Sequence, residues 1–352
     1  MTTQEIETPA LLVDLDQMEA NLKRMAAFFR SAPANLRPHF KNHKSPELAK
    51  RQLDAGAIGL ACATLREAEC LVEHGIRSIL LANEIVDSIK IRRWVELARQ
   101  ADLIVCVDDE RVASDLARAG RNHNTPLSVL VDVDVGQHRC GVPPGDAAVR
   151  VVRRVVEEGL RFRGLMGYGG HLSHQQPGPE KDAAVAAAMG PLMETKALLE
   201  REGIAVEIVS AGATGTYSLG CYPGVTEVQA GSYLLMDTNY RQCCTDFDLT
   251  LTVLATVISK TGREHIVVDA GVKTLSCERG IPAVKDLEGL IVRTLNAEHG
   301  IIDLDETSAS VQIGDRIELW VRYSDATINL HDRMYGVRNG QVEKVFELCR
   351  RA

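Results

Sequence analysis

Short apolar runs rich in β-branched residues recur along the first two thirds of the chain, separated by segments with apolar residues at helical spacing, such as 45–55, 65–74 and 147–158. This alternation predicts parallel strands joined by crossover helices. Eight strand-like runs are present, at 37–41, 57–63, 78–82, 103–107, 127–133, 164–168, 206–210 and 227–233. We therefore predict a (β/α)8 TIM-type barrel over residues 14–245. A doubly wound sheet is the competing fold, but no G-x-G-x-x-G motif follows an early strand.

The pattern changes after about residue 245, where strand-like runs follow one another without helices between them, at 249–258, 266–269, 316–321, 334–337 and 342–346. The last two flank Arg338-Asn-Gly-Gln341, which is a strong signal for a tight hairpin. The N-terminal run at 10–13 is also strand-like. We therefore predict a C-terminal all-β domain made of residues 246–352 together with residues 1–13.

Composition narrows the class of partner. The chain has 352 residues, of which 45% are hydrophobic and 25% charged, as in an ordinary globular protein. Its formal net charge of −8 argues against nucleic acid or an anionic membrane, so a small molecule is the better partner. No signal-peptide pattern and no membrane-length apolar run occurs, which predicts a cytoplasmic protein. Nine cysteines without C-x-x-C spacing predict reduced thiols.

The first candidate for chemistry is Lys41, at the end of the first predicted strand. Ser45, Pro46 and Glu47 follow, and these residue types suit the N-cap and first turn of a helix. Ligands of barrel enzymes bind at the carboxyl ends of the strands, and a desolvated lysine there can form a Schiff base. The alternative is a solvated basic turn made of Lys41, His43 and Lys44.

Three further segments carry polar residues beyond predicted strands. Residues 210–216 are rich in glycine and threonine and follow the seventh strand, where barrels bind phosphate. Arg139 follows the fifth strand and can bind a carboxylate or phenolate through two nitrogens, although a surface ion pair is equally plausible. The sixth strand leads to Tyr168, His171 and His174, and the two histidines are candidate general bases.

Taken together, several motifs resemble the D-threonine aldolase and D-serine dehydratase family, whose members share the alanine-racemase-like fold type III of pyridoxal-phosphate enzymes. The resemblance runs nearly end to end, and it rests on the segments 38–44, 134–141, 164–168, 212–216, 229–233 and 327–332. It implies that the cofactor is pyridoxal 5'-phosphate and that Lys41 forms the Schiff base. It also implies that the phosphate is held by the loop that contains Gly212, Thr214, Gly215 and Thr216.

The same resemblance assigns the other positions around the cofactor. Arg139 matches the arginine near the phenolic oxygen, and Tyr168 matches the residue packed against the ring. Gln229 stands where alanine racemases have an arginine at the pyridine nitrogen. His39 belongs to the segment around the lysine and is expected beside the cofactor. His174 matches the aldolase histidine that deprotonates the β-hydroxyl of the substrate, and we keep His171 as a second candidate base.

One position departs from the family pattern. Family members usually have His-x-Cys or His-x-Asp shortly before the Asn-Leu pair, and these side chains bind a divalent metal, whereas this chain has Tyr323-Ser-Asp325. A neutral phenol is a poor ligand, and one carboxylate holds Mg²⁺ or Mn²⁺ only weakly. Either the metal is lost or His171 and His299 rebuild its site.

The resemblance implies a lyase that acts on a D-configured β-hydroxy amino acid, and we expect retro-aldol cleavage to glycine and an aldehyde. Dehydration of D-serine or D-3-hydroxyaspartate is the main alternative. It depends more on a metal because hydroxide is a poor leaving group. A racemase and a non-catalytic pyridoxal-phosphate-binding protein are further alternatives. In this fold the β-domain of one subunit completes the site of the other, so a homodimer is expected.

Overall fold

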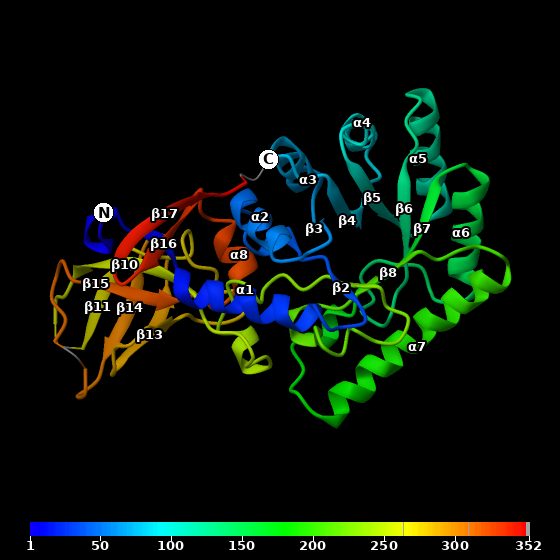
Figure 1. Ribbon diagram of the computed structural model, residues 1–352. Helices are drawn as coiled ribbons and strands as arrows, with labels where there is room; N and C mark the ends of the chain where they lie inside the picture. The colour runs from blue at the N-terminus through cyan, green and yellow to red at the C-terminus, as the bar shows by residue number, and fades with distance from the viewer. Residues whose placement is uncertain (263, 309, 350–352) are drawn as a thin grey trace. The chain divides into compact units, whose positions relative to one another are not determined.

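The computed structural model describes residues 1–262, 264–308 and 310–349 (Figure 1). The chain divides into two compact units. One consists of residues 25–41 and 48–231 and contains the parallel strands, and the other consists of residues 1–24, 42–47 and 232–352 and contains most of the antiparallel strands. The expected class, a barrel with a C-terminal β-domain, is confirmed.

Eight parallel strands form the first unit, in the sheet order β2-β9-β8-β7-β6-β5-β4-β3. A parallel bridge between His39 and Ala61 joins the two ends of this order and closes the ring. The strands are β2 (Asn35–Leu36), β3 (Leu60–Cys62), β4 (Ser78–Glu84), β5 (Asp102–Val107), β6 (Ser128–Asp132), β7 (Arg161–Gly167), β8 (Ile208–Ala211) and β9 (Glu227–Val228).

Crossover helices connect these strands, and Figure 1 shows α4, α5 and α6 side by side outside the sheet. The helices are α2 (Pro46–Asp54), α3 (Leu65–Glu73), α4 (Ser88–Leu97), α5 (Glu110–Asn122), α6 (Asp146–Glu157) and α7 (Pro179–Arg201). Thr64, Asp87 and Asp109 cap three of them, because their side-chain oxygens accept bonds from first-turn N–H groups. Within the described residues, no helix is long and apolar enough to cross a membrane.

The interior of the ring is filled by side chains from successive strands. Leu80, Ile104 and Cys106 pack there with Leu130, Met166 and Ile208. All six are at most 9% exposed, so the middle of the barrel is a solid core rather than a pore. Polar chemistry is therefore restricted to the ends of the strands.

The first strand is much shorter than the run 37–41 predicted from the sequence. β2 ends at Leu36, and Lys41 lies in a 3-10 turn, η2 (Phe40–Asn42), rather than at the end of a strand. Pro38 accounts for the difference, because it has no N–H to donate to a strand ladder. Helix α2 nevertheless starts at Pro46, as the Ser45-Pro46 pair predicted.

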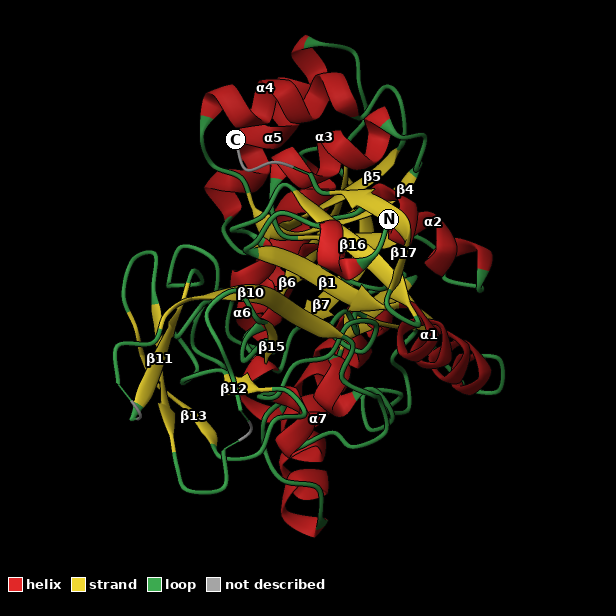
Figure 2. Cartoon of the chain, turned by 90° about the vertical axis from the view of Figure 1, so that its left-hand side faces the viewer, coloured by secondary structure: helices red, strands yellow, loops and turns green. Residues whose placement is uncertain are grey.

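The second unit is mostly β. Its main path of strands runs β13-β14-β11-β10-β1-β16-β17. Off this path, β15 pairs with β10 and β12 pairs with β15 (Figure 2). The strands are β1 (Ala10–Asp14), β10 (Leu251–Ser259), β11 (His265–Val268), β12 (Ala283–Val284), β13 (Leu290–Leu295), β14 (Gly300–Leu304), β15 (Arg316–Trp320), β16 (Arg333–Arg338) and β17 (Gln341–Glu347). The N-terminal strand joins this sheet, as predicted, by pairing with β10 and β16.

The predicted hairpin is present between β16 and β17. Asn339 and Gly340 both have positive φ, 50° and 72°, which is the conformation that a tight Asn-Gly hairpin turn requires. The unit is not purely β, since it also contains the short helix α8 (Ser324–Ile328). Helix α1 (Leu15–Phe29) links β1 to the barrel strands along the chain.

Candidate active site

A cavity of about 220 Å³ lies at the carboxyl ends of the barrel strands. Five residues predicted from the sequence line it together: His39, Lys41, Arg139, Tyr168 and Gln229. The other lining residues are Ala63, Ala82, Asn83, Cys140 and Met166. The loops after β2, β6, β7 and β9 therefore converge on one chamber.

Two lysines stand close in sequence, but their environments differ. Lys41 lines the cavity and is half-buried, with the fully buried Phe40 before it. Lys44 has a positive φ of 51°, and its Nζ donates to Asn329 Oδ1 at 2.6 Å. The amine that faces the chamber is that of Lys41.

Arg139 extends from the loop 133–142 that follows β6. Its guanidinium carbon lies 5.3 Å from the centroid of the Tyr168 ring, a cation–π distance. Asp134 organises the start of the loop, because its Oδ1 accepts from the N–H groups of Gly136 and His138 at 2.9 and 3.0 Å. The arginine is thus presented by a hydrogen-bonded loop rather than by a loose surface segment.

Gln229 and His39 are buried on another side of the cavity. Gln229 is 4% exposed, its Nε2 donates to Ser210 Oγ at 2.9 Å, and its N–H donates to the carbonyl of Ala211 at 3.0 Å. The first bond ties the side chain of Gln229 to strand β8, and the second ties its main chain to the same strand. His39 is 9% exposed and belongs to the bridge that closes the ring.

The loop after β8 contains the predicted phosphate-binding residues Gly212, Thr214, Gly215 and Thr216. It forms a 3-10 turn, η4 (Thr214–Thr216), in which the N–H of Ala213 donates to Thr216 Oγ1 at 3.1 Å. Gly215 packs so closely that a Cβ there would lie 1.8 Å from the carbonyl oxygen of Ser173. The tight packing lets only glycine occupy this position without movement of the β7 loop.

The two candidate bases follow β7. His171 lies in the 3-10 turn η3 (Gly170–Leu172), His174 comes three residues later, and both are exposed. Neither is among the residues that line the 220 Å³ cavity. Both therefore stay proposed bases, His174 because it matches the family motif and His171 because it also follows a barrel strand.

Tyr323 and Asp325 lie in the second unit, where Tyr323 precedes helix α8. Asp325 Oδ1 accepts from Asn42 Nδ2 at 2.8 Å, and the guanidinium carbon of Arg279 lies 5.5 Å from the Tyr323 ring centroid. Across the described part of the chain, no three His, Cys, Asp or Glu side chains gather as a metal site, and His299 is exposed. This donor set fits a divalent metal poorly, so we derive no step through one.

Three carboxyl groups beside the cavity were not predicted from the sequence. Glu84 ends β4, Asp108 follows β5 and Asp132 ends β6. Burial, together with the charges of Glu84 and Asp108, raises the pKa of Asp132 to about 8. Burial and the charge of Asp108 likewise raise the pKa of Glu84. The signal that could have revealed them is an acid at the end of each of three consecutive strands.

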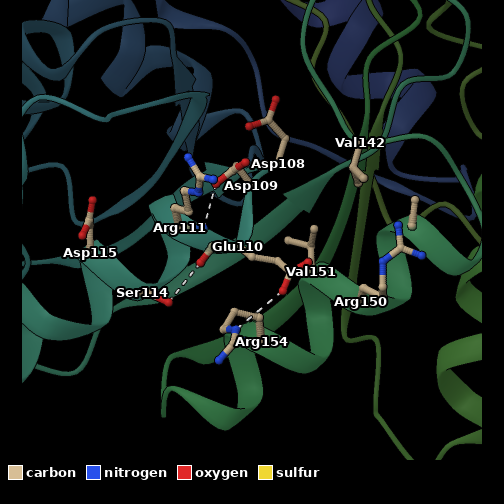
Figure 3. Close-up of a pocket in the computed structure, with 11 residues that line it drawn as sticks. Asp108, Asp109, Glu110, Arg111, Ser114, Asp115, Val142, Arg150, Val151 and Arg154 are labelled. Atoms are coloured by element: carbon tan, nitrogen blue, oxygen red, sulfur yellow. Dashed lines mark hydrogen bonds and ion pairs between the residues drawn. The ribbon is translucent and has the colours of Figure 1, made fainter.

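A larger surface hollow of about 870 Å³ lies between α5 and α6 (Figure 3). Figure 3 shows one ion pair among the residues drawn, in which Arg154 faces Glu110 with 3.6 Å between Nε and Oε2. Asp108, one of the three carboxyl groups described above, also lines this hollow. We assign no chemistry to this open groove, whose lining mixes acidic residues with arginines.

Comparison with known proteins agrees with this arrangement. The family model "Alanine racemase, N-terminal domain" matches residues 13–239, and a serine dehydratase domain model matches residues 250–337. D-threonine aldolase of Arthrobacter sp. is 37% identical over 98% of this chain and 93% of its own length. The 3-hydroxy-D-aspartate aldolase of Paracoccus denitrificans (strain Pd 1222) is 33% identical over 100% of this chain and 94% of its own.

The fold agrees as well. The crystal structure of D-threonine aldolase from Filomicrobium marinum superposes with a TM-score of 0.95 at 37% identity, covering 99% of this chain and 96% of that one. A dehydratase that acts on D-threo-3-hydroxyaspartate is also among the relatives. These matches span both units. The chain therefore belongs to the alanine-racemase-like family of D-threonine aldolases and D-serine dehydratases, a family of pyridoxal-phosphate-dependent lyases.

Proposed function

We propose that this protein is a pyridoxal-phosphate-dependent aldolase that cleaves a D-configured β-hydroxy amino acid into glycine and an aldehyde. The observation that carries the proposal is the position of Lys41, which faces one cavity with Arg139, Tyr168 and Gln229. The 37% identity to a D-threonine aldolase over nearly the whole chain supports the same reaction.

The residues present fit the cofactor by their chemistry. The Lys41 amine can condense with an aldehyde, and the Arg139 guanidinium can donate to a phenolate oxygen. Tyr168 offers an aromatic face, and Gln229 is an uncharged partner for a ring nitrogen. The tight glycine and threonine turn after β8 offers N–H and hydroxyl donors for a phosphate. When bound, the cofactor supplies an electron sink for the pair left when a bond to the substrate Cα breaks.

The chain's own residues then select the bond. In retro-aldol cleavage, His174 accepts the proton of the substrate β-hydroxyl, the Cα–Cβ bond breaks, and the aldehyde leaves. A proton delivered to Cα completes glycine. Arg139 and Tyr168 hold their side of the pocket in place, and Gln229, tied to Ser210, fixes the opposite side. A base alone can drive this cleavage, so the poor metal ligands at 323 and 325 are compatible with it.

Dehydration is the second candidate, because a dehydratase 31% identical to this chain is among the relatives. That reaction would break the bond between Cβ and oxygen and release ammonia and a keto acid. Product analysis with D-threonine, D-serine and D-3-hydroxyaspartate separates the two reactions. Glycine plus an aldehyde supports the proposal, while ammonia in equal amount to a keto acid would replace it.

Covalent attachment of the cofactor to Lys41 gives a direct test. Borohydride reduction followed by peptide mass spectrometry should place the pyridoxyl group on Lys41, and Lys41→Ala should lose both the label and activity. Lys44→Ala is the matched control, because Lys44 is bonded to Asn329, and it should keep the label. Labelling of Lys41→Ala at another lysine would contradict the assignment.

We also propose that two chains form an isologous dimer, in which the β-unit of one completes the active site of the other. The exposure of Arg139, His171 and His174 in a single chain supports this assembly, because a catalytic site works best when closed from water. Sedimentation should show a dimer at the concentrations where the enzyme is active. A fully active monomer would exclude it.

A further inference from the structure

The two exposed histidines of the β7 loop lie in a turn that is short and has few bonds of its own. We call residues 169–175 the base turn, since they contain His171 and His174. The N–H of Leu172 donates to the carbonyl of Gly169 at 3.0 Å, a 3-10 bond of the kind that closes η3. Single bonds of this type have poorer geometry than those of an α-helix. The position of the histidines therefore depends on what holds the base turn from outside.

The start of the base turn is held by Gln137. The N–H of Gly170 donates to Gln137 Oε1 at 2.9 Å. A Cβ at Gly170 would lie 2.8 Å from the same oxygen and 2.5 Å from the Tyr168 ring, so both side chains rest directly on the turn. Gln137 comes two residues before Arg139 in the loop 133–142. The loop that presents the arginine therefore also fixes the start of the base turn.

The end of the base turn is held by Lys181, on the first turn of α7. Its side chain is buried, at 3% exposure, and its Nζ donates to the main-chain oxygen of Gln175 at 3.0 Å. Lysine is almost never buried this deeply unless it is paired, and a cation in the first turn of a helix opposes the helix dipole. A lysine at this position is thus unfavourable by itself, and the bond to Gln175 is the interaction that it gains.

Helix α7 is itself fixed to the strand that leads into the base turn. Lys181 lies on the buried face of α7 together with Val185 and Leu192. Leu192 packs so closely on the end of β7 that a Cβ at Gly167 would lie 2.6 Å from its Cδ2. The lysine therefore fastens the end of the base turn to a helix that packs against β7.

The middle of the base turn abuts η4, the predicted phosphate-binding turn. Ser173 is 1% exposed, and its carbonyl oxygen is the atom that a Cβ on Gly215 would overlap. The main chain of the base turn is thus restrained at its start, its middle and its end, while His171 and His174 stay exposed. Such an arrangement fixes the backbone from which a base extends and leaves its ring accessible.

We propose that Gln137 and Lys181 are positioning residues, which hold the two ends of the base turn and thereby set where the His174 imidazole meets the substrate β-hydroxyl. The assignment of His174 as the base rests on the proposed function above, whereas the two restraints on the turn do not depend on it. A general base must come within hydrogen-bond reach of the proton that it takes, so a shift of about 1 Å is enough to slow the reaction about a hundredfold.

The kinetics of two substitutions test the positioning role. Methionine keeps a flexible apolar body in place of lysine or glutamine but provides no strong donor or acceptor. Lys181→Met and Gln137→Met should each lower kcat at least about tenfold, for the D-β-hydroxy amino acid that the wild type cleaves best, and change KM no more than about threefold, because the base rather than substrate binding is displaced. Lys196→Met is the matched control. Lys196 lies on the same helix and pairs with Glu200, so its substitution should leave kcat unchanged.

Hydrogen exchange in the cofactor-free protein gives a readout that needs neither cofactor nor substrate. Peptides that cover the base turn should exchange at least about fivefold faster in Lys181→Met and in Gln137→Met, the size expected when one hydrogen bond of a local structure is lost. Exchange in strand β6 should stay as in the wild type. Gln137→Glu keeps an oxygen that can accept from Gly170, so it should protect the base turn as the wild type does, and so should Lys196→Met.

Each result bears on one part of the proposal. Unchanged exchange of the base turn in both methionine variants, or acceleration that spreads evenly over β6 and the rest of the barrel unit, would overturn the proposed restraints. Local acceleration with unchanged kcat would overturn the positioning role. If Lys181→Met does not fold, Gln137→Met carries both measurements on its own. Failure of the wild type to cleave any D-β-hydroxy amino acid would overturn the proposed function and with it the role of His174, and hydrogen exchange would then judge the restraints alone.

Discussion

The guanidinium carbon of Arg139 lies 5.3 Å from the centroid of the Tyr168 ring, so two residues from neighbouring strand ends form one wall of the cavity. The contact limits the rotation of the arginine and directs its N–H groups. A lysine could keep the charge but not the planar pair of donors. The wall is therefore specific for arginine.

Arg139→Lys should weaken binding of pyridoxal phosphate by about tenfold, which is the value of one charge-assisted hydrogen bond of about 1.5 kcal/mol. A fluorescence titration of the cofactor-free protein measures this affinity. Arg111→Lys, in the groove between α5 and α6, is the control and should bind like the wild type. Unchanged affinity in Arg139→Lys would remove the arginine from the cofactor site.

Gly215→Ala should destabilise the protein, because its Cβ would lie 1.8 Å from the carbonyl oxygen of Ser173. Overpacking of this kind costs about 1–3 kcal/mol. Gly190→Ala in α7 is the matched control, since nothing lies within 4 Å of the added Cβ there. That change should stabilise the protein by about 0.5–1 kcal/mol, because glycine is unfavourable inside a helix. Thermal unfolding of both variants is the measurement, and equal melting temperatures would refute the packing argument.

Asp132 should make the folded state less stable as the pH rises. In the unfolded chain this carboxyl loses its proton near its ordinary pKa of 3.8, whereas in the folded protein burial and the nearby Glu84 and Asp108 keep the proton until about pH 8. The folded state thus binds more protons between these values, so the free energy of unfolding falls with increasing pH across that window and levels off above it. The contribution of Asp132 to the free energy of unfolding is therefore greatest at the acidic end of this pH window.

Asp132→Asn removes this titration. The melting temperature of the variant, relative to that of the wild type, should therefore rise from pH 5 to pH 8. Asp115→Asn, on the exposed face of α5, gives the baseline. A constant difference between Asp132→Asn and wild type across this range would show that Asp132 titrates normally in the folded protein.

Tyr323→His should create a metal-binding pair with Asp325, because an imidazole is a far better ligand at neutral pH than a phenol. Calorimetric titration with Mn²⁺ should show tighter binding by the variant than by the wild type. Wild-type activity should respond little to EDTA. About one tightly bound divalent ion per purified wild-type chain would contradict this prediction.

Local patterns predicted those parts of the fold that local physics determines. The alternation of strands and helices, the Asn-Gly hairpin and the start of α2 at Pro46 follow from short stretches of sequence. The length of β2 could not be predicted as well, because Pro38 ends the ladder while the apolar pattern continues. Helix α8 is only five residues long and leaves no periodic signal.

In the candidate site, too, some features follow from local sequence and others only from the three-dimensional structure. Lys41 is recognisable from its neighbours, and its place in the cavity with Arg139, Tyr168 and Gln229 agrees with the family motif. The meeting of Glu84 and Asp132 was not predictable, since these residues are 48 positions apart and meet only through the register of β4, β5 and β6. Raised pKa values arise from such three-dimensional proximity, which no single segment contains.

Closure of the barrel through the bridge between His39 and Ala61 leaves that sheet with no open edge. The main β path, in contrast, ends in β13 on one side and in β17 on the other, and residues 1–2 hydrogen-bond to the start of β17 only. An open edge can pair with a strand of another molecule and start aggregation. Both edges carry charges that discourage such pairing, with Arg293 on β13 and Glu343, Lys344 and Glu347 on β17. Replacing these charged residues with threonine should favour edge-to-edge association of two chains.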